Sequence, residues 1–284
     1  MATQFEQDLA PKLTLLACQV TVPPTPSVDA RDTHVARLAE MVDRNLSDQR
    51  VDLVVLPELS CIDYSREAFD QLNAIAEPAE GPSFQTFSVV ARRHNTTIAF
   101  GIAEAAETDF HISQVVIGPD GALIGTYRKI HIAQFGASME KEYFQAAPQL
   151  LVFEINGIGI APIICYDIRV PELCRTLCLK HGADLILHCG AYARDLSFHT
   201  WPHFAVTRAL ENQVHFLSLN RAGPEFGSSM YCPPWIDETQ PQVTFGVGEE
   251  IRRFVIDLAT TAEVCETYSF LADRLDDYEN LPLD

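Results

Sequence analysis

Short apolar stretches rich in β-branched residues alternate with amphipathic helical patterns along the chain, and this alternation constrains the fold more than any other feature. Strands are predicted at Leu13–Val20, Val51–Leu56, Thr97–Glu104, Ser113–Ile117, Leu123–Lys129, Leu150–Ile155, Ile158–Cys165, Ala183–Cys189, His215–Asn220, Arg252–Asp257 and Glu263–Tyr268. Helices are predicted at about Asp29–Asn45, Pro82–His94, Pro171–Lys180 and Thr200–Asn212. This order predicts a layered α/β structure with helices on the outside.

Two turn signals indicate a mixed sheet rather than a purely parallel one. Pro119-Asp120-Gly121 separates two predicted strands, and Asn156-Gly157 is the two-residue sequence most typical of a tight hairpin. Both pairs of strands are therefore expected to run antiparallel. No linker-like stretch or internal repeat divides the sequence, so residues 1–284 are interpreted as one domain, with about 270–284 as a C-terminal tail or arm.

Charge and cysteine content exclude several classes of partner. The chain carries 20 Lys plus Arg against 39 Asp plus Glu, a net charge of −19, whereas nucleic acids and anionic membranes both require basic surface. Met1–Leu9 has no basic residue, so no secretory signal is expected, and no apolar run reaches the roughly 18 residues that cross a bilayer. Eight cysteines without tight repeated pairs are typical of reduced thiols. Together these features predict a cytoplasmic protein.

Three reactive residues stand where predicted strands end, which is where α/β sheets carry their chemistry. Cys165 follows the apolar run Ile158–Ile164 and precedes a helix, a position that favours a thiolate. Glu58 follows Val51–Leu56, and burial there would raise its pKa into the range of a general base. Lys129 ends a hairpin strand. Each residue taken alone also fits a structural role, as a buried cysteine, a solvated loop acid or an edge-strand charge.

The combination of three segments favours the chemical roles. These segments are Leu56-Pro57-Glu58, Tyr127-Arg128-Lys129-Ile130-His131 and Ile164-Cys165-Tyr166-Asp167-Ile168-Arg169-Val170-Pro171-Glu172. In order and separation they resemble the signature segments of the nitrilase (carbon-nitrogen hydrolase) superfamily, and the similarity extends to Gln19, Arg208-Ala209-Leu210-Glu211-Asn212 and Asn220-Arg221. The resemblance implies a four-layer αββα sandwich with mixed sheets, and a Glu-Lys-Cys triad.

On this chain the triad falls on Glu58, Lys129 and Cys165. The resemblance implies that Glu58 takes the thiol proton and later activates water, while Cys165 attacks the carbonyl to form a thioester. Lys129 and the Tyr166 N–H would stabilise the oxyanion. Many members carry a second glutamate, which we assign to Glu140. No cofactor and no metal are expected.

Several neighbouring residues keep two interpretations each. Glu142 competes with Glu140 for the place of the second glutamate. Arg169 is a candidate carboxylate clamp, or else the partner of Glu172 or another acid in an ion pair. His131 could orient Lys129 or bind a substrate oxygen, or make a plain structural hydrogen bond. Further candidates are three histidines that could line a pocket, His188, His199 and His203, and two cysteines at helical spacing that are interpreted as core packing, Cys174 and Cys178.

The function implied is a hydrolase that cleaves a non-peptide carbon–nitrogen bond of a small amide and releases ammonia or an amine. An ω-amide of a dicarboxylic acid is the first expectation. An N-carbamoyl amine or amino acid, suggested by Glu140–Phe144, is the alternative, and a nitrile is third. A non-catalytic scaffold and a redox-sensing thiol protein are hypotheses of another class. The resemblance also implies a homodimer or higher homo-oligomer, with the C-terminal segment reaching the partner.

Overall fold

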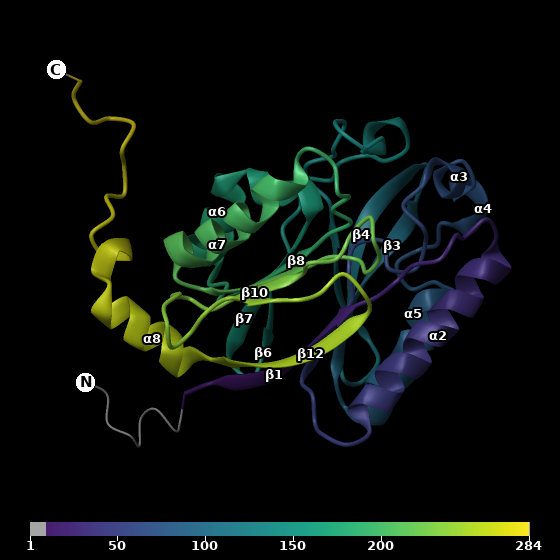
Figure 1. Ribbon diagram of the computed structural model, residues 1–284, viewed down its shortest axis with the longest axis horizontal. Helices are drawn as coiled ribbons and strands as arrows, with labels where there is room; N and C mark the ends of the chain where they lie inside the picture. The colour runs from purple at the N-terminus through teal and green to yellow at the C-terminus, as the bar shows by residue number, and fades with distance from the viewer. Residues whose placement is uncertain (1–9, 284) are drawn as a thin grey trace.

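The computed structural model describes residues 10–283, which form two six-stranded sheets packed face to face (Figure 1). The first sheet has the order β12-β1-β2-β3-β4-β5 and the second β11-β10-β9-β8-β7-β6. The strands are β1 Lys12–Gln19, β2 Leu53–Val55, β3 Thr97–Ala106, β4 Asp109–Ile117, β5 Leu123–Arg128, β6 Phe153–Ile155, β7 Ile158–Ile164, β8 Leu185–Cys189, β9 His215–Leu219, β10 Met230–Cys232, β11 Val243–Thr244 and β12 Glu250–Asp257. The helices are α2 Val28–Leu46, α3 Arg66–Phe69, α4 Leu72–Ile75, α5 Pro82–His94, α6 Pro171–His181, α7 Trp201–Asn212 and α8 Leu258–Thr267, with 3₁₀ turns at Glu140–Glu142, Cys165–Arg169, Phe198–Thr200 and Ser269–Leu271.

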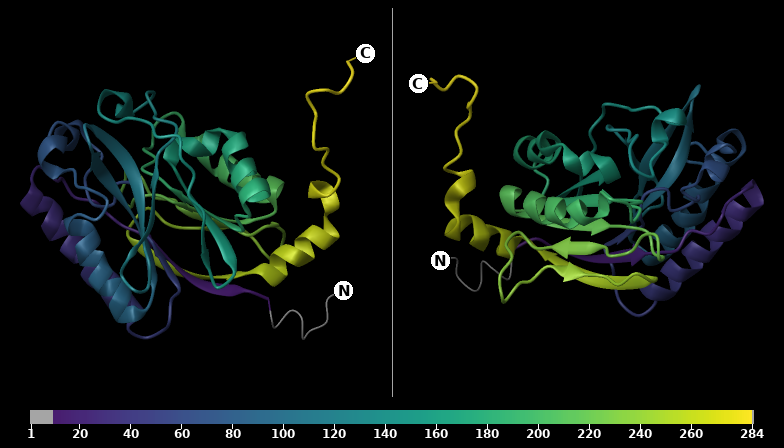
Figure 2. Two further views of the ribbon diagram at one scale, coloured as in Figure 1. Left: turned by 180° about the vertical axis from the view of Figure 1, so that it is seen from behind. Right: turned by 45° about the horizontal axis from the view of Figure 1, so that its top comes forward.

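Strand β1 illustrates why each sheet is apolar on both faces. Successive side chains of a strand point to opposite faces. Leu15 and Ala17 lie in the core between the two sheets, whereas Leu16 and Cys18 pack against α2 and α5. A third core lies between the second sheet and α6 with α7. The layers are therefore helix, sheet, sheet and helix, as Figure 2 shows, and the predicted αββα sandwich is confirmed.

The predicted mixture of parallel and antiparallel pairs is also confirmed. Strands β3, β4 and β5 are antiparallel neighbours, whereas β1, β2 and β3 are parallel. In the second sheet β6 and β7 form a hairpin. Its turn is Asn156-Gly157, where both residues have positive φ (52° and 79°), the backbone that a two-residue hairpin of this kind requires. Strands β7, β8 and β9 then run parallel, joined by α6 and α7.

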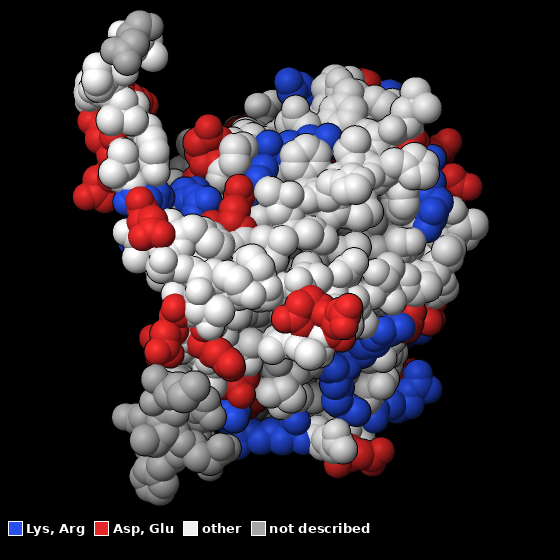
Figure 3. Space-filling model, turned by 60° about the vertical axis from the view of Figure 1, so that its left-hand side comes forward, with Lys and Arg blue, Asp and Glu red and all other residues white. Residues whose placement is uncertain are grey.

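The predicted strand Glu263–Tyr268 is wrong, because most of it belongs to helix α8. The Asp257 side chain caps this helix by accepting a hydrogen bond of 3.0 Å from the Ala259 N–H. Only Val264 is buried in the helix, so no sheet face is available to select a strand. The remaining chain to residue 283 projects away from the body (Figure 1) and gathers acidic side chains (Figure 3). Sequence analysis also missed two short strands, β10 and β11.

The cysteines are free thiols, and all eight lie within the described part of the chain. Cys174 is buried in the core beneath α6, and Cys178 packs against the same core. Their predicted role in packing is confirmed. None of the helices in residues 10–283 combines the length and apolar character needed to span a membrane.

Candidate active site

Four reactive side chains from distant parts of the sequence meet between the two sheets. Glu58 follows β2, Lys129 follows β5, Cys165 follows β7, and Glu140 lies in a 3₁₀ turn. The Lys129 Nζ donates to Glu58 Oε1 at 2.8 Å and to Glu140 Oε1 at 2.7 Å. Oxygen atoms of the two carboxylates and the Cys165 Sγ all lie within 4.8 Å of one another.

The same cluster bears on metal binding. Two carboxylates and a thiol supply the donor atoms that cations bind. The ammonium of Lys129, however, lies within hydrogen-bond distance of both carboxylates. The negative charge of Glu58 and Glu140 is thus partly compensated by a cation that belongs to the chain itself.

Glu58 is held rigidly by its surroundings. Its second carboxylate oxygen accepts a hydrogen bond of 2.7 Å from the Ala191 N–H. Buried Arg221 donates to the carbonyls of Glu58 (3.2 Å) and Leu59 (2.5 Å), which fixes the loop after β2. Gly101 of β3 lies under this loop, and a Cβ there would lie 2.4 Å from the Leu59 nitrogen. The loop therefore needs glycine at position 101.

Glu140, rather than Glu142, lies in the site. Its carboxylate is fully buried and accepts hydrogen bonds from the Tyr64 hydroxyl (2.8 Å) and the Ala133 N–H (2.9 Å). Glu142 is two residues further along the 3₁₀ turn and points outward, where it pairs with exposed Arg66 at 2.6 Å. The turn geometry separates two glutamates that the sequence alone leaves as competitors.

Burial and mutual charge set the protonation of the cluster. Burial raises the pKa of Glu58, as predicted; the Lys129 ammonium opposes this shift and the Glu140 carboxylate adds to it. Burial works to lower the pKa of Lys129, but the two carboxylates outweigh it and the pKa is raised. Lys129 is therefore a permanent cation at neutral pH.

The expected thiolate at Cys165 is wrong for the free site. Burial raises the pKa of the Cys165 thiol well above its usual value, and the nearby Glu58 carboxylate adds to the rise; Lys129 only partly offsets them. Proximity to a lysine favours a thiolate only where that cation is not already neutralised. Here two carboxylates compensate Lys129, so the resting group is a neutral thiol that requires a base to become a nucleophile.

Cys165 lies at a sharp turn between β7 and the following 3₁₀ turn, with φ at +46°, a conformation that costs a non-glycine residue free energy. Buried Asp167 braces the turn by accepting hydrogen bonds from the Ile164 N–H (3.0 Å) and the Tyr127 hydroxyl (2.7 Å). His131 also donates to Asp167, from Nδ1 at 2.7 Å. His131 is not among the residues that line the adjoining pocket, and its ring makes this structural hydrogen bond. Its contact with a substrate oxygen stays a prediction.

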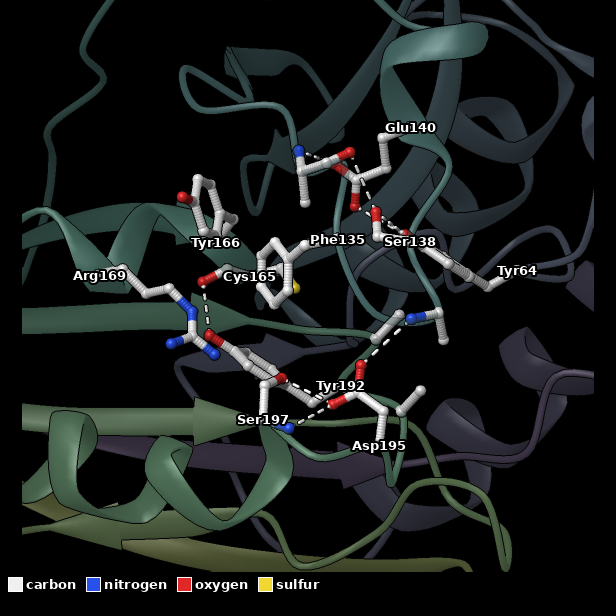
Figure 4. Close-up of a pocket in the computed structure, with 14 residues that line it drawn as sticks. Tyr64, Phe135, Ser138, Glu140, Cys165, Tyr166, Arg169, Tyr192, Asp195 and Ser197 are labelled. Atoms are coloured by element: carbon white, nitrogen blue, oxygen red, sulfur yellow. Dashed lines mark hydrogen bonds between the residues drawn. The ribbon is translucent and has the colours of Figure 1, made fainter.

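A pocket of about 40 Å³ that is open to solvent leads to Cys165 (Figure 4). Aromatic, basic and acidic side chains line it, including Tyr64, Phe135, Tyr166, Arg169, Tyr192 and Asp195. The Arg169 guanidinium lies 5.2 Å from the ring centres of both Phe135 and Phe204. Its Nε and Nη2 are buried and have no hydrogen-bond partner in the described part of the chain. The pocket thus presents an unpaired cation a short distance along the chain from the thiol.

Several residues of the site were missed or left undecided at the level of sequence. Tyr64 follows Glu58 by six residues, and Ala191 and Tyr192 follow β8. These residues lie in loops, where no periodic pattern marks them. The side chain of His188 reaches Cys165, and its Nε2 lies 2.9 Å from the Cys165 carbonyl oxygen. Their sequence signal is position: Tyr64 comes shortly after β2, His188 lies within β8 and Tyr192 follows it, and β8 is the neighbour of β7.

Comparison with known proteins matches the part of the chain that contains these residues. A family model described as carbon-nitrogen hydrolase matches residues 17–241. A nitrilase of Pyrococcus abyssi is 36% identical over 66% of this chain and 69% of its own. A 2-oxoglutaramate amidase of Bacillus subtilis is 30% identical over 79% of this chain and 85% of its own. The crystal structure of a CN-hydrolase superfamily protein from Xanthomonas campestris, with an arsenic adduct in its active site, covers 96% of this chain and 99% of that one at a TM-score of 0.79 and 25% identity.

Proposed function

The chain belongs to the carbon-nitrogen hydrolase family, and we propose that it hydrolyses a small primary amide that carries a carboxylate, by way of a thioester on Cys165. The observation that carries the proposal is the cluster of Cys165 with buried Glu58, Lys129 and Glu140 at the pocket. Nucleophile, base and cation are within reach of one substrate carbonyl in this arrangement.

In the proposed reaction Glu58 transfers protons in both half-reactions, and Cys165 forms and then releases the thioester. Glu58 accepts the Cys165 proton as the sulfur attacks the amide carbon, and Lys129 with the Tyr166 N–H binds the oxyanion that forms. The tetrahedral intermediate collapses as Glu58 returns the proton to the departing ammonia. Glu58 then removes a proton from water, which attacks the thioester, and Glu58 returns that proton to the sulfur as the acid leaves and the Cys165 thiol is restored. Glu140 holds Lys129 in position.

Arg169 supports the carboxylate-bearing class of substrate. A guanidinium with buried, unpartnered N–H groups costs free energy unless a ligand pairs with it, and a carboxylate is the group that fits its planar donors. The alternative pairing with Glu172 is not formed by those nitrogens. The names of the relatives agree, since a 2-oxoglutaramate amidase and an omega-amidase of Danio rerio are among them.

The test is a substrate panel with ammonia release as the readout. It compares ω-amides of dicarboxylic acids, N-carbamoyl amino acids, uncharged aliphatic amides and nitriles, and intact-protein mass is read in samples quenched during turnover. The proposal requires the highest kcat/KM on the ω-amides and an acyl adduct on the protein. Preference for N-carbamoyl compounds would instead support an N-carbamoyl amine or amino acid hydrolase. If no class is turned over, the scaffold and redox-sensing hypotheses would be favoured over hydrolysis.

Arg169→Met is expected to lower kcat/KM for an ω-amide about 10- to 100-fold relative to an uncharged amide of equal length. A hydrogen bond to a charged group contributes about 1.5–3 kcal/mol, and each 1.4 kcal/mol is tenfold. The measured quantity is the ratio of the two kcat/KM values in wild type and variant. Arg169→Lys is the control: it keeps the charge without the planar pair of donors, and an intermediate ratio is expected. An unchanged ratio in Arg169→Met would refute the clamp.

Glu140→Gln is expected to move the acid limb of the kcat/KM profile to lower pH. Glu58 must be ionised to accept the thiol proton, and the Glu140 charge raises the pKa of Glu58. Removing that charge lowers this pKa, so activity persists to a lower pH before Glu58 is protonated. Profiles from about pH 4 to about pH 8, each normalised to its own maximum, measure the shift. Glu142→Gln, which neutralises the exposed partner of Arg66, is the matched control and should leave the limb in place.

We also propose a cytoplasmic homodimer or higher homo-oligomer. Free thiols at all eight cysteines fit a reducing compartment. The C-terminal segment projects from the body (Figure 1). It exposes several large apolar side chains that a second subunit would bury: Tyr268, Phe270, Leu275, Tyr278 and Leu281. Light scattering at micromolar concentration tests the assembly, and a single species at the chain mass of 31.6 kDa would contradict it.

A further inference from the structure

The backbone carbonyl of Cys165 is held by two side chains that the proposed reaction does not use. The Tyr192 hydroxyl donates to this oxygen at 3.0 Å, as Figure 4 shows, and the His188 Nε2 lies 2.9 Å from it. His188 belongs to β8, the strand beside β7, and Tyr192 follows the same strand. Both donors thus come from one neighbouring segment and converge on the peptide that joins Cys165 to Tyr166.

The direction of every hydrogen bond in this group follows from chemistry. A carbonyl oxygen only accepts, so the His188 Nε2 carries a proton. The His188 Nδ1, 2.6 Å from the Ser218 Oγ, must then accept, because burial lowers the pKa of His188 to about 4 and keeps the ring neutral. Ser218 in turn accepts from the Trp201 Nε1, which can only donate, at 2.6 Å. Trp201, Ser218 and His188 form one buried series of hydrogen bonds that ends on the Cys165 oxygen.

The peptide group whose oxygen accepts these hydrogen bonds also carries the N–H proposed for the oxyanion site. Peptide bonds in the described residues are trans, so the Tyr166 N–H points opposite to the Cys165 C=O. Tyr166 lies in the first turn of a 3₁₀ helix, where amide groups have no partner within the helix. Fixing the carbonyl therefore fixes the direction of a free N–H. Hydrogen bonds accepted by a peptide oxygen also polarise the group and strengthen the bond that its N–H donates.

We propose that His188 and Tyr192 are positioning residues of the oxyanion site, which act through the Cys165 carbonyl to orient and polarise the Tyr166 N–H. The inference rests on the proposed function, because it assumes a tetrahedral intermediate on Cys165. The competing explanation is that both residues merely brace the strained turn at Cys165. The two explanations differ in what they predict for reactions at sulfur that form no oxyanion.

Tyr192→Phe is the first variant of the test. It removes the hydroxyl and keeps the ring, which stacks on Trp201 with 5.0 Å between centroids and 6° between planes. Two probes report on the site. Carbonyl-¹³C butyraldehyde forms a tetrahedral hemithioacetal at the thiol, observed by NMR, whereas iodoacetamide alkylates sulfur by direct displacement and forms no oxyanion.

For Tyr192→Phe we expect kcat to fall about tenfold and KM to change less than twofold. The Kd of butyraldehyde should rise by the same factor as kcat falls. Both effects are smaller than the loss expected when an oxyanion donor is removed entirely. The iodoacetamide rate should remain within twofold of wild type. His188→Gln, which keeps a donor near the Nε2 position, should lose less than His188→Leu. Melting temperatures identify any variant that fails to fold, and Tyr192→Phe alone then carries the test.

Tyr231→Phe is the matched control. Its hydroxyl makes a similar buried bond to a histidine, His215 Nδ1 at 2.8 Å, but lies outside the pocket lining. It should alter stability without changing turnover or aldehyde binding. An unchanged butyraldehyde Kd in Tyr192→Phe, or an equal loss of alkylation, overturns the inference and leaves the proposed function standing. If wild type itself forms no hemithioacetal, the proposed function falls together with the inference.

Discussion

Replacement of Cys165 by alanine is expected to lower kcat/KM by at least about 10⁴-fold on the best substrate of the panel. The remaining groups can polarise an amide but offer no nucleophile of comparable strength. The same variant should lose the acyl adduct that wild type carries during turnover. Ammonia release measures the first effect, and intact-protein mass after acid quenching measures the second.

The control for this variant is another cysteine of the same chain. Cys265 lies exposed on α8, away from the pocket lining, and Cys265→Ala should retain both turnover and adduct. Persistence of the adduct in Cys165→Ala would assign the nucleophile elsewhere and would remove the thioester mechanism. Reversible oxidation of Cys165 in a wild type that hydrolyses nothing would favour the redox-sensing hypothesis.

Lys129→Met is expected to abolish turnover and also to reduce the free energy of unfolding by about 3–5 kcal/mol. The variant leaves Glu58 and Glu140 buried beside each other without their shared cation. Burial and repulsion then raise the folded-state pKa of Glu58 further above its unfolded value. Such a group costs little stability below its unfolded pKa, and the loss grows as pH rises from the unfolded pKa to the raised folded pKa, above which it stays constant. Urea unfolding at several pH values measures it.

Two further variants test the cause of the lost stability. Lys129→Met combined with Glu58→Gln removes one buried charge and should recover part of the unfolding free energy at neutral pH. Arg66→Met breaks the exposed pair with Glu142 and should change stability far less, because solvent screens that pair. A Lys129→Met protein as stable as wild type at every pH would show that the two carboxylates do not depend on this ammonium.

Much of the fold follows from local pattern. The helix Pro82–His94 has the bounds that its periodicity predicts, and the hairpin at Asn156-Gly157 forms because those residues accept positive φ. The failure at Glu263–Tyr268 has the opposite cause. Its β-branched and aromatic residues favour a strand, but the capping Asp257 and the absence of a buried face in most of this segment favour the helix.

Positions of Glu58, Lys129 and Cys165 were predictable from the sequence because strand ends are readable in the order of residues and the three segments resemble a family. Which glutamate is buried, whether the thiol is neutral and what holds its carbonyl depend instead on groups far away in the chain. Glu140 and Glu142 differ by two residues and only the 3₁₀ turn separates them. The pKa of Cys165 depends on burial and on nearby charges, and the hydrogen bond from His188 to the Cys165 carbonyl joins two neighbouring strands. These charges and groups come within range of one another only when the sheets are packed.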